Sequence, residues 1–475
     1  MLLASLYRRI GLRSEGGQIV AEKNVGGLGT SLKNSIAKKV GKDTTRSKIS
    51  VEGWQGIIED VIRSPKTPNQ GKSNFIQTTP IVPSAAIYSM AARLRGNPWN
   101  PGGLIESCLC YGEQSEETMN ELWKALFEAL SVQDANDDVW AIFLEREFAE
   151  WNAEQGVTWS NDRRVDYADW LGGWQKDQIP CPARRFASDL RHLLGAKSFL
   201  TRRQWTSSLE AILRIGLGSH VLWVSKINFE VFRIAEQVLR GKPVPDRETI
   251  ETLLSTNDGI WTYGQLVGAH IKKIMRDYLY GRLGINMLLH RCEEVEGLAQ
   301  FAENSPLSSI DTFSEFLRAL SDSRDAINVS EFQRELDTAV ESDPRKMAVK
   351  SGTGKNIEEF LRHALGQRET LERGLESYDQ GYLISRKSSY SRAPWILAAG
   401  PVMILSLVYA CIRDGSGIRT VEDLCNHLGE YGIKISPDDV ADSKLGQSLR
   451  TLGLVIDSPD AEGGMVLLDP FGAIA

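Results

Sequence analysis

The sequence predicts a mainly α-helical protein, built as a multi-helix bundle or helical array. Apolar residues recur at helical spacing almost without interruption from residue 183 to residue 299. Alternating patterns typical of strands are few outside the C-terminal region. With 475 residues, 42% of them hydrophobic and 25% charged, the chain has an ordinary globular composition. It is long enough for several domains and a sizeable core.

Residues 1–50 are predicted to form a basic, Gly- and Lys-rich N-terminal arm. The arm has ten basic and three acidic side chains, a charge of +7 (10 − 3), and the remainder of the chain therefore carries −14 because the whole chain is −7. A basic arm on an acidic body favours a polyanion partner such as nucleic acid. The alternative is a solvated tail that binds nothing.

Residues 51–180 are predicted to form a mixed, Trp-rich helical domain. Apolar residues repeat at helical spacing within Leu122–Leu130 and again within Val139–Trp151, so we expect two amphipathic helices there. Six tryptophans lie between Trp123 and Trp174. Core packing is the favoured interpretation, and a protein-binding surface is the alternative.

Residues 181–342 are predicted to form a helical core domain. A long helical region is expected over residues 263–298, and Gly281 or Gly284 is the point where it would break. A polar linker is expected at 343–356. A charged helix over residues 357–378 then opens the last domain, residues 357–475.

The order of elements after residue 400 is specific. An apolar helix is expected over Pro401–Ile412, because proline is favoured at the first position of a helix. Shorter helices are expected from Thr420 and from Ser436. A hairpin follows, in which residues 454–456 and 465–468 flank a turn.

This order, with the segments Val421–Leu424 and Leu445–Leu454, resembles the winged-helix superfamily over residues 401–471. The resemblance implies a C-terminal winged helix-turn-helix appended to the helical array. In DNA-binding members the third helix enters the major groove, which would place Lys444 and Arg450 at DNA. From Arg413 onward, however, acids outnumber bases by eleven to five. We therefore favour a winged helix that binds protein.

The chain as a whole also resembles, in composition and layout, accessory subunits encoded in bacterial phage-defence operons. Basic residues interleaved with aromatic ones can hold phosphates and stack on bases. Three internal clusters of this kind occur, and they are taken together with the basic arm. They lie near Trp205, over residues 272–282 with Tyr278 and Tyr280, and around Tyr390. The predicted nucleic-acid-binding residues are Arg8, Arg9, Lys38, Lys39, Arg184, Arg185, Arg202, Arg203, Lys272, Lys273, Arg386, Lys387, Arg392, Lys444 and Arg450.

No linear motif predicts a catalytic residue, a metal site or a cofactor. The six cysteines include no Cys-x-x-Cys, and the six histidines form no zinc-binding pattern. Glu-x-Lys of restriction-type nucleases and Gly-x-Ser-x-Gly of hydrolases are both missing. The uncharged run 395–412 is broken by Gly400-Pro401, so we assign it to the protein interior and predict no membrane partner. Scattered cysteines favour the cytoplasm.

Three hypotheses follow. The first is a non-catalytic subunit of a nucleic-acid-processing assembly, contacting nucleic acid through its basic segments and a partner protein through the acidic winged helix. Anti-phage defence is the setting that the resemblance implies. The second is a nuclease-like enzyme whose site is assembled near Asp277, His290 and Glu294 without a linear motif. The third is a winged-helix DNA-binding regulator.

Overall fold

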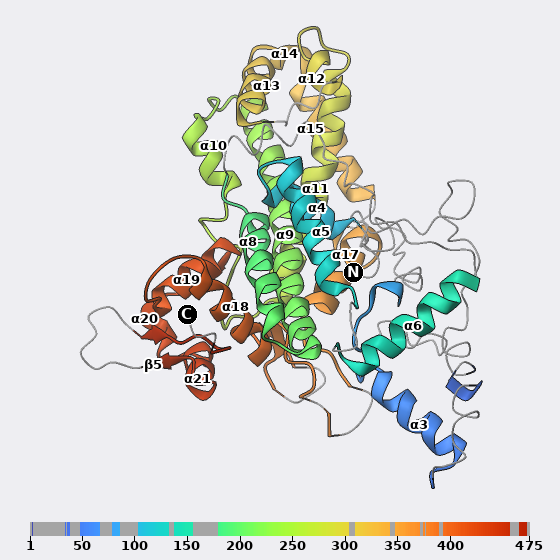
Figure 1. Cartoon of the computed structure of the whole chain (residues 1–475). Coiled ribbons are helices and arrows are strands. Elements are labelled where there is room, and N and C mark those ends of the chain that lie inside the picture. Colours follow the sequence, from blue (N-terminus) through green and yellow to red (C-terminus); the bar gives the residue numbers. More distant parts are fainter. Residues whose placement is uncertain are drawn as a thin grey trace.

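The computed structural model describes residues 2, 34, 36–38, 48–66, 78–85, 103–132, 137–154, 179–303, 309–342, 347–370, 374–375, 377–388, 393–456 and 465–472. Over these residues the protein is mainly helical, with three small two-stranded sheets (Figure 1). The predicted α-helical class is confirmed at this level.

The first helices lie in the predicted Trp-rich region. They are α3 (Val51–Ile62), α4 (Leu104–Gly112), α5 (Glu116–Leu130) and α6 (Val139–Glu154). Helices α5 and α6 contain the two predicted apolar repeats, although α5 begins at Glu116, before the first repeat starts. Ser115 caps α5, because its hydroxyl accepts a hydrogen bond from the Thr118 amide at 3.2 Å.

A long central helix, α9 (Arg202–Leu239), organises the core (Figure 1). The helices α4, α8 (Pro182–Gly195), α11 (Gly268–Cys292), α17 (Gly352–Leu365) and α18 (Pro401–Arg413) all pack against it. As a result, nearly every residue of α9 between 208 and 223 is buried. A helix that is apolar all round belongs in such a position. The short 3-10 helix η3 (Ala196–Ser198) joins α8 to α9.

Helix α11 is continuous, so the predicted break at Gly281 or Gly284 is wrong. A Cβ atom at Gly281 would lie 2.7 Å from the backbone oxygen of Asn228 on α9. At Gly284 it would lie 2.2 Å from the ring of Phe232. The two glycines therefore allow α9 and α11 to approach closely, and they do so inside a regular helix.

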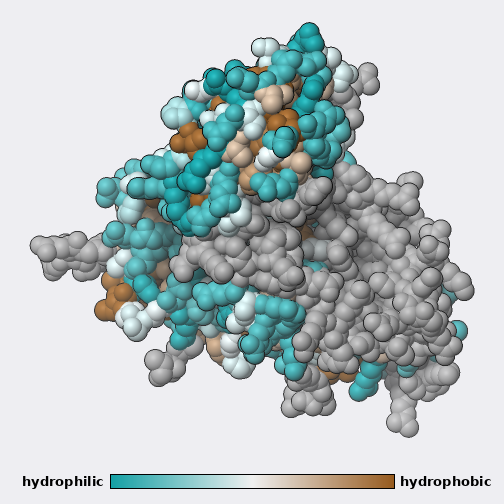
Figure 2. Space-filling model, turned by 90° about the horizontal axis from the view of Figure 1, so that it is seen from above, coloured by the Kyte–Doolittle hydropathy of each residue, from teal (hydrophilic) through white to brown (hydrophobic). Residues whose placement is uncertain are grey.

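Helices α10, α12, α13, α14 and α15 gather at one end of the molecule (Figure 1). Their bounds are Arg247–Leu254, Ala299–Glu303, Ile310–Asp322, Arg324–Ile327 and Val329–Ser342. Figure 2 looks down on this end and shows a mostly hydrophilic described surface, with hydrophobic residues visible among the hydrophilic ones.

Helix α17 differs from the helix predicted over 357–378. It begins at Gly352, within the predicted linker, and ends at Leu365, where Gly366 becomes extended and bridges Ile384. Strands β2 (Ile384–Arg386) and β3 (Trp395–Leu397) then pair antiparallel. The chain after residue 366 therefore leaves the helix to join a small sheet.

The C-terminal elements follow the predicted order. They are α18, α19 (Val421–Glu430), β4 (Ile433–Lys434), α20 (Pro437–Val440), α21 (Lys444–Thr451), β5 (Val455–Ile456) and β6 (Val466–Leu467). The helix predicted from Ser436 is split in two, because Ser443 caps α21 by accepting from the Gly446 amide and donating to the Val440 carbonyl. Strand β4 pairs in parallel with β1 (Trp261–Thr262), and β5 pairs antiparallel with β6.

One hydrophobic cluster extends from α4 through α9 and α11 to β6. The C-terminal elements thus share their core with the rest of the protein. Among the helices in the described ranges, none combines the length and the apolar character needed to cross a membrane.

Candidate functional site

We call residues 401–456 and 465–472 the C-terminal unit. One side of this unit faces the core, since α18 packs on α8 and α9, α19 packs on α8, and β4 pairs with β1. The extensive contacts of α20, α21, β5 and β6 are with other elements of the unit itself. Figure 1 shows α20, α21 and β5 on the side of the unit away from α9.

A buried ionic network fixes the core-facing side. Asp189 of α8 has no exposed surface and accepts hydrogen bonds from Arg185 Nε and from the Tyr431 hydroxyl, both at 2.7 Å. Its second oxygen also lies 2.9 Å from Nε2 of His427. Burial opposes ionisation of Asp189, but interactions with His427 and Arg185 outweigh it and lower the pKa of this carboxyl. Asp189 is therefore a buried carboxylate that joins α8 to α19.

Arg185 carries the network on to α18. Its two terminal nitrogens donate to both oxygens of Asp414, at 2.6 and 2.8 Å, in a bidentate pair. Burial on its own would raise the pKa of Asp414. The hydrogen bonds and the positive charge of Arg185 have a larger, opposite effect, so the pKa of Asp414 is lowered. Together these contacts join α8, α18 and α19 into one ionic cluster, which holds the C-terminal unit against the core.

The outward side of the unit is polar. On α21, Leu445 and Leu449 are buried, whereas Lys444, Gln447 and Thr451 are exposed along the opposite face. These three residues follow the spacing of one helix face.

The charge beside this face is negative. Asp438 and Asp439 on α20 and Asp442 in the following turn are all exposed. Arg450 donates to the Ala441 carbonyl at 2.7 Å, so its guanidinium reaches back toward α20. Three carboxylates against the two cations Lys444 and Arg450 therefore leave the surface around the start of α21 with a net negative charge. We call Asp438, Asp439, Asp442, Lys444 and Gln447 the outward surface.

Two of the predicted nucleic-acid-binding residues lie inside the protein. Arg185, 4% exposed, belongs to the network described above. Arg202, 6% exposed, donates to the carbonyls of Leu130 and Ser131, each at 2.9 Å, and pairs with Asp137 at 2.6 Å. It thereby satisfies backbone groups at the end of α5. Neither side chain is accessible to a phosphate, which corrects this part of the prediction.

The other predicted basic residues are spread over several elements. Arg203 pairs with Asp138, Lys273 pairs with Asp277, and Arg386 lies 4.8 Å from the centre of the Trp395 ring. These three and the remaining described residues are exposed or half-buried; the remaining ones are Lys38, Arg184, Lys272, Lys387, Lys444 and Arg450. Arg8, Arg9, Lys39 and Arg392 lie outside the described residues.

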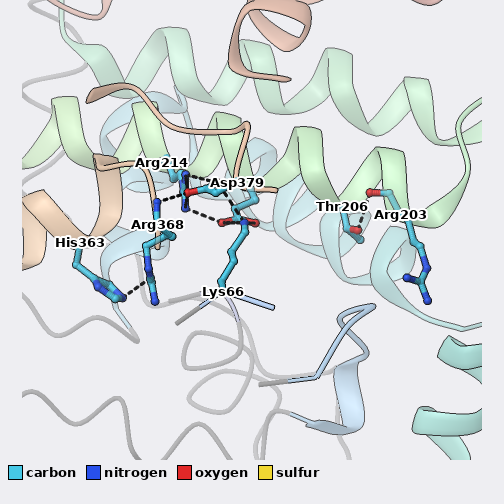
Figure 3. A network of polar contacts seen from close by, with 8 residues as sticks. Lys66, Arg203, Thr206, Arg214, His363, Arg368 and Asp379 are labelled. Carbon is cyan, nitrogen blue, oxygen red and sulfur yellow. Dashed lines mark hydrogen bonds and ion pairs between the residues drawn. The ribbon is translucent and has the colours of Figure 1, made fainter. Parts of the chain in front are cut away.

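A second charged cluster was not predicted from the sequence. Asp379, with no exposed surface, pairs with Arg214 of α9 at 3.1 Å and with Lys66 at 3.4 Å, and accepts from the Arg368 amide at 2.6 Å (Figure 3). Lys66 also contacts Glu210 at 2.7 Å. The cluster ties three distant segments together, and no pattern of neighbouring residues signals it.

The nuclease-like site expected near Asp277, His290 and Glu294 is not assembled. Asp277 and His290 are 13 positions apart on α11, which separates them by about 20 Å along the helix. His290 pairs instead with Glu293, at 3.2 Å. Across the described ranges no group of three or more His, Cys, Asp or Glu side chains could hold a metal ion. All six cysteines are buried, and none forms a disulfide.

The geometry thus offers an acidic surface that faces outward from a unit firmly anchored on a helical core. The anchoring residues come from α8, α18 and α19, and the surface comes from α20 and α21. No protein-family model, no curated protein and no solved structure matches this chain.

Proposed function

We propose that this protein is a non-catalytic subunit of a nucleic-acid-processing assembly, and that its C-terminal unit is an acidic winged helix that binds a partner protein. The outward surface is the observation that carries the proposal. The order of three helical segments and a hairpin supports the winged-helix assignment. So does the bridge between Thr420 and Val466, which adds a third chain segment to the hairpin.

Charge favours protein over DNA at this surface. A helix that enters DNA needs cations near the phosphates. Here the exposed carboxylates Asp438, Asp439 and Asp442 directly precede α21 and its lysine Lys444 in the chain. The same carboxylates would attract a basic patch on a protein and would steer its approach.

Apolar side chains next to the hairpin would add contact area. Ile418, Ile456 and Leu468 are 80%, 52% and 37% exposed. Ile456 pairs with Val466, and Thr420 bridges the same valine, so these three residues share one face of the sheet. Leu468 is two positions from Val466 and Ile418 is two positions from Thr420, and side chains alternate along a strand, so both lie on that same face. An exposed apolar group rimmed by charge is typical of protein interfaces.

The first experiment recovers the full-length chain from its native host with any stoichiometric partner. We expect the partner to be lost when Asp438, Asp439 and Asp442 are all changed to lysine. Asp322, Asp325 and Glu341, also exposed acids, lie on the helices at the far end and make the matched control. Their reversal to lysine should leave the partner bound. A partner retained by the first variant contradicts the proposal.

The second experiment tests the part of the proposal that concerns nucleic-acid binding. Binding of labelled duplex DNA and single-stranded RNA is titrated with salt, for the natural chain and for a variant with Arg8, Arg9, Lys38 and Lys39 changed to glutamine. Substitution is preferable to truncation because Leu2 and Ile36 are buried in the structure. If the arm neutralises phosphates, affinity falls steeply with salt and the variant has a flatter slope. No binding by the natural chain at low salt overturns this half.

A further inference from the structure

A groove of about 830 Å³ opens where the C-terminal unit meets the core. The core contributes the start of α8 and the segment 256–262, and the unit contributes one face of α19 together with β4 and the two residues that follow it. Sites that hold small molecules have volumes of about 300–1,000 Å³. The groove is therefore large enough for a small ligand that contacts both parts of the protein.

Two cations border the groove, Arg184 from α8 and Lys434 from β4. Neither forms an ion pair with another residue in the part of the chain that the structure describes. The one carboxyl in the lining, Glu430, lies 3.7 Å from Arg185, which is a cation outside the lining. The groove thus offers two positive groups that are available to an anion.

The side chain of Lys434 is held in the groove by a glycine of the opposite wall. A Cβ atom at Gly259 would lie 2.6–2.9 Å from three side-chain carbons of Lys434, so the lysine stem crosses this residue. Gly259 also has a φ of +71°, which glycine adopts without strain. The missing side chain at position 259 therefore makes room for Lys434 along the wall.

A second lysine lies near Lys434. Lys226 of α9 is half-buried and donates a hydrogen bond to the Ser255 carbonyl at 3.2 Å. Burial lowers the pKa of Lys226, and the charge of Lys434 adds to this effect, whereas Asp258 and Glu230 oppose it. The two ammonium groups therefore repel each other, and an anion beside Lys434 would relieve that repulsion.

Uncharged polar side chains also border the groove. Thr262 comes from β1, Asn257 from the segment before it, and Asn426 from α19. None of these side chains makes a hydrogen bond within the described ranges. Hydroxyl and amide groups can both donate to and accept from the hydroxyls of a sugar. No aromatic residue is among the described residues of the lining, so the groove provides no ring to stack on a base.

We propose that the groove binds a small phosphorylated sugar, either free or as part of a nucleotide. Its phosphate pairs with Arg184 and Lys434, and its hydroxyls meet the polar side chains of the lining. A small ligand fits better than a nucleic-acid strand. The exposed carboxylates Asp438 and Asp439 follow Ser436 of the lining by two and three positions, and they would repel the further phosphates of a strand. This ligand is additional to the partners of the proposed function.

The test is calorimetric titration of the full-length protein with adenosine monophosphate, ribose 5-phosphate and adenosine. We expect saturable binding of adenosine monophosphate, and binding of adenosine that is about tenfold weaker or more, because adenosine lacks the phosphate. Binding of ribose 5-phosphate as well would show that a free sugar phosphate is sufficient. Binding of adenosine monophosphate without ribose 5-phosphate would identify a nucleotide as the source of the phosphate.

Variants locate the site. The double variant Arg184→Glu, Lys434→Glu should weaken binding of adenosine monophosphate by about tenfold or more. The control, Lys272→Glu with Lys387→Glu, reverses two exposed cations outside the lining and should bind as the natural protein does. Equal thermal midpoints of the unliganded variants establish that the fold is intact. Lys434→Gln changes a single exposed side chain and provides the same test if the double variant fails to fold.

Binding should also slow hydrogen exchange in the segment 256–262 and in α19, since these are opposite walls of the groove. Four results would each overturn the proposal. They are no binding of either phosphate, equal affinity for adenosine and adenosine monophosphate, unchanged affinity in the charge-reversed variant, and displacement by an oligonucleotide at a lower concentration than adenosine monophosphate requires.

Discussion

The two sides of the C-terminal unit use the same residue types in opposite ways. On the core-facing side, Arg185, Asp189 and His427 are each 4% exposed or less, and each has a charged or polar partner. On the outward side, Asp438 and Asp439 are exposed, and no ion pair joins them to another described residue. A buried charge without a partner costs several kcal/mol, whereas an exposed one costs little. The contrast separates charges that hold the fold from charges left available for binding.

The largest effect is expected from Asp189→Ala. This change leaves Arg185 buried without its α8 carboxylate and removes the acceptor of the Tyr431 hydroxyl. Breaking a buried pair by removing one partner costs roughly 3–5 kcal/mol. The free energy of unfolding, measured with denaturant at neutral pH, should fall by that amount.

Asp438→Ala is the matched control for this change, because it removes the same side chain from the outward side. We expect it to leave the denaturant midpoint almost unchanged. If both variants lost the same stability, burial would not distinguish the two sides, and the comparison would fail.

The second effect is a loss of stability in acid that arises in the core. His220 on α9 is 2% exposed. The centre of its ring lies 5.3 Å from the ring centre of Tyr111 and 6.0 Å from that of Trp223. Burial lowers its pKa to about 4, from an ordinary value near 6.5. The folded state therefore favours neutral histidine, and the unfolded state takes up the proton first as pH falls.

The stability that neutral His220 contributes is fully present above about pH 6.5 and is lost as pH falls toward about 4. A shift of this size is linked to roughly 3 kcal/mol at most. We expect the denaturant midpoint to fall between pH 7.5 and pH 5, and the fall to be smaller in His220→Phe. If the denaturant midpoint of His220→Phe fell with pH as much as that of the natural chain, the acid sensitivity would arise from other groups.

Local signals in the sequence predicted the elements of the unit, and nothing local predicted what its charges do. Pro401 and Thr420 start α18 and α19 as expected, because proline and threonine act within one helical turn. By contrast, Arg185 meets Asp414 229 positions later, and Asp189 meets His427 238 positions later. A count of basic residues near Trp205 therefore could not show that Arg185 is buried and neutralised.

The glycines of α11 teach the same lesson. Read along the chain, Gly281 and Gly284 weaken a helix by lowering its propensity. In the folded protein their missing side chains admit Asn228 and Phe232 of α9, and the packing maintains the helix. Whether a glycine breaks a helix or allows close packing depends on a second helix that the local sequence does not specify.

The smallest effect on stability is expected where the proposed effect on binding is largest. Changing Asp438, Asp439 and Asp442 to lysine alters three exposed side chains and moves the net charge from −7 to −1 (−7 + 6). Exposed substitutions of this kind change the free energy of unfolding by about 1 kcal/mol or less in total. Thermal and denaturant midpoints close to those of the natural chain, together with loss of the partner, would mean that these acids serve recognition. Suppose instead that the midpoints fell as far as in Asp189→Ala. The outward carboxylates would then belong to the fold, and the distinction between the two sides of the unit would no longer support a docking role.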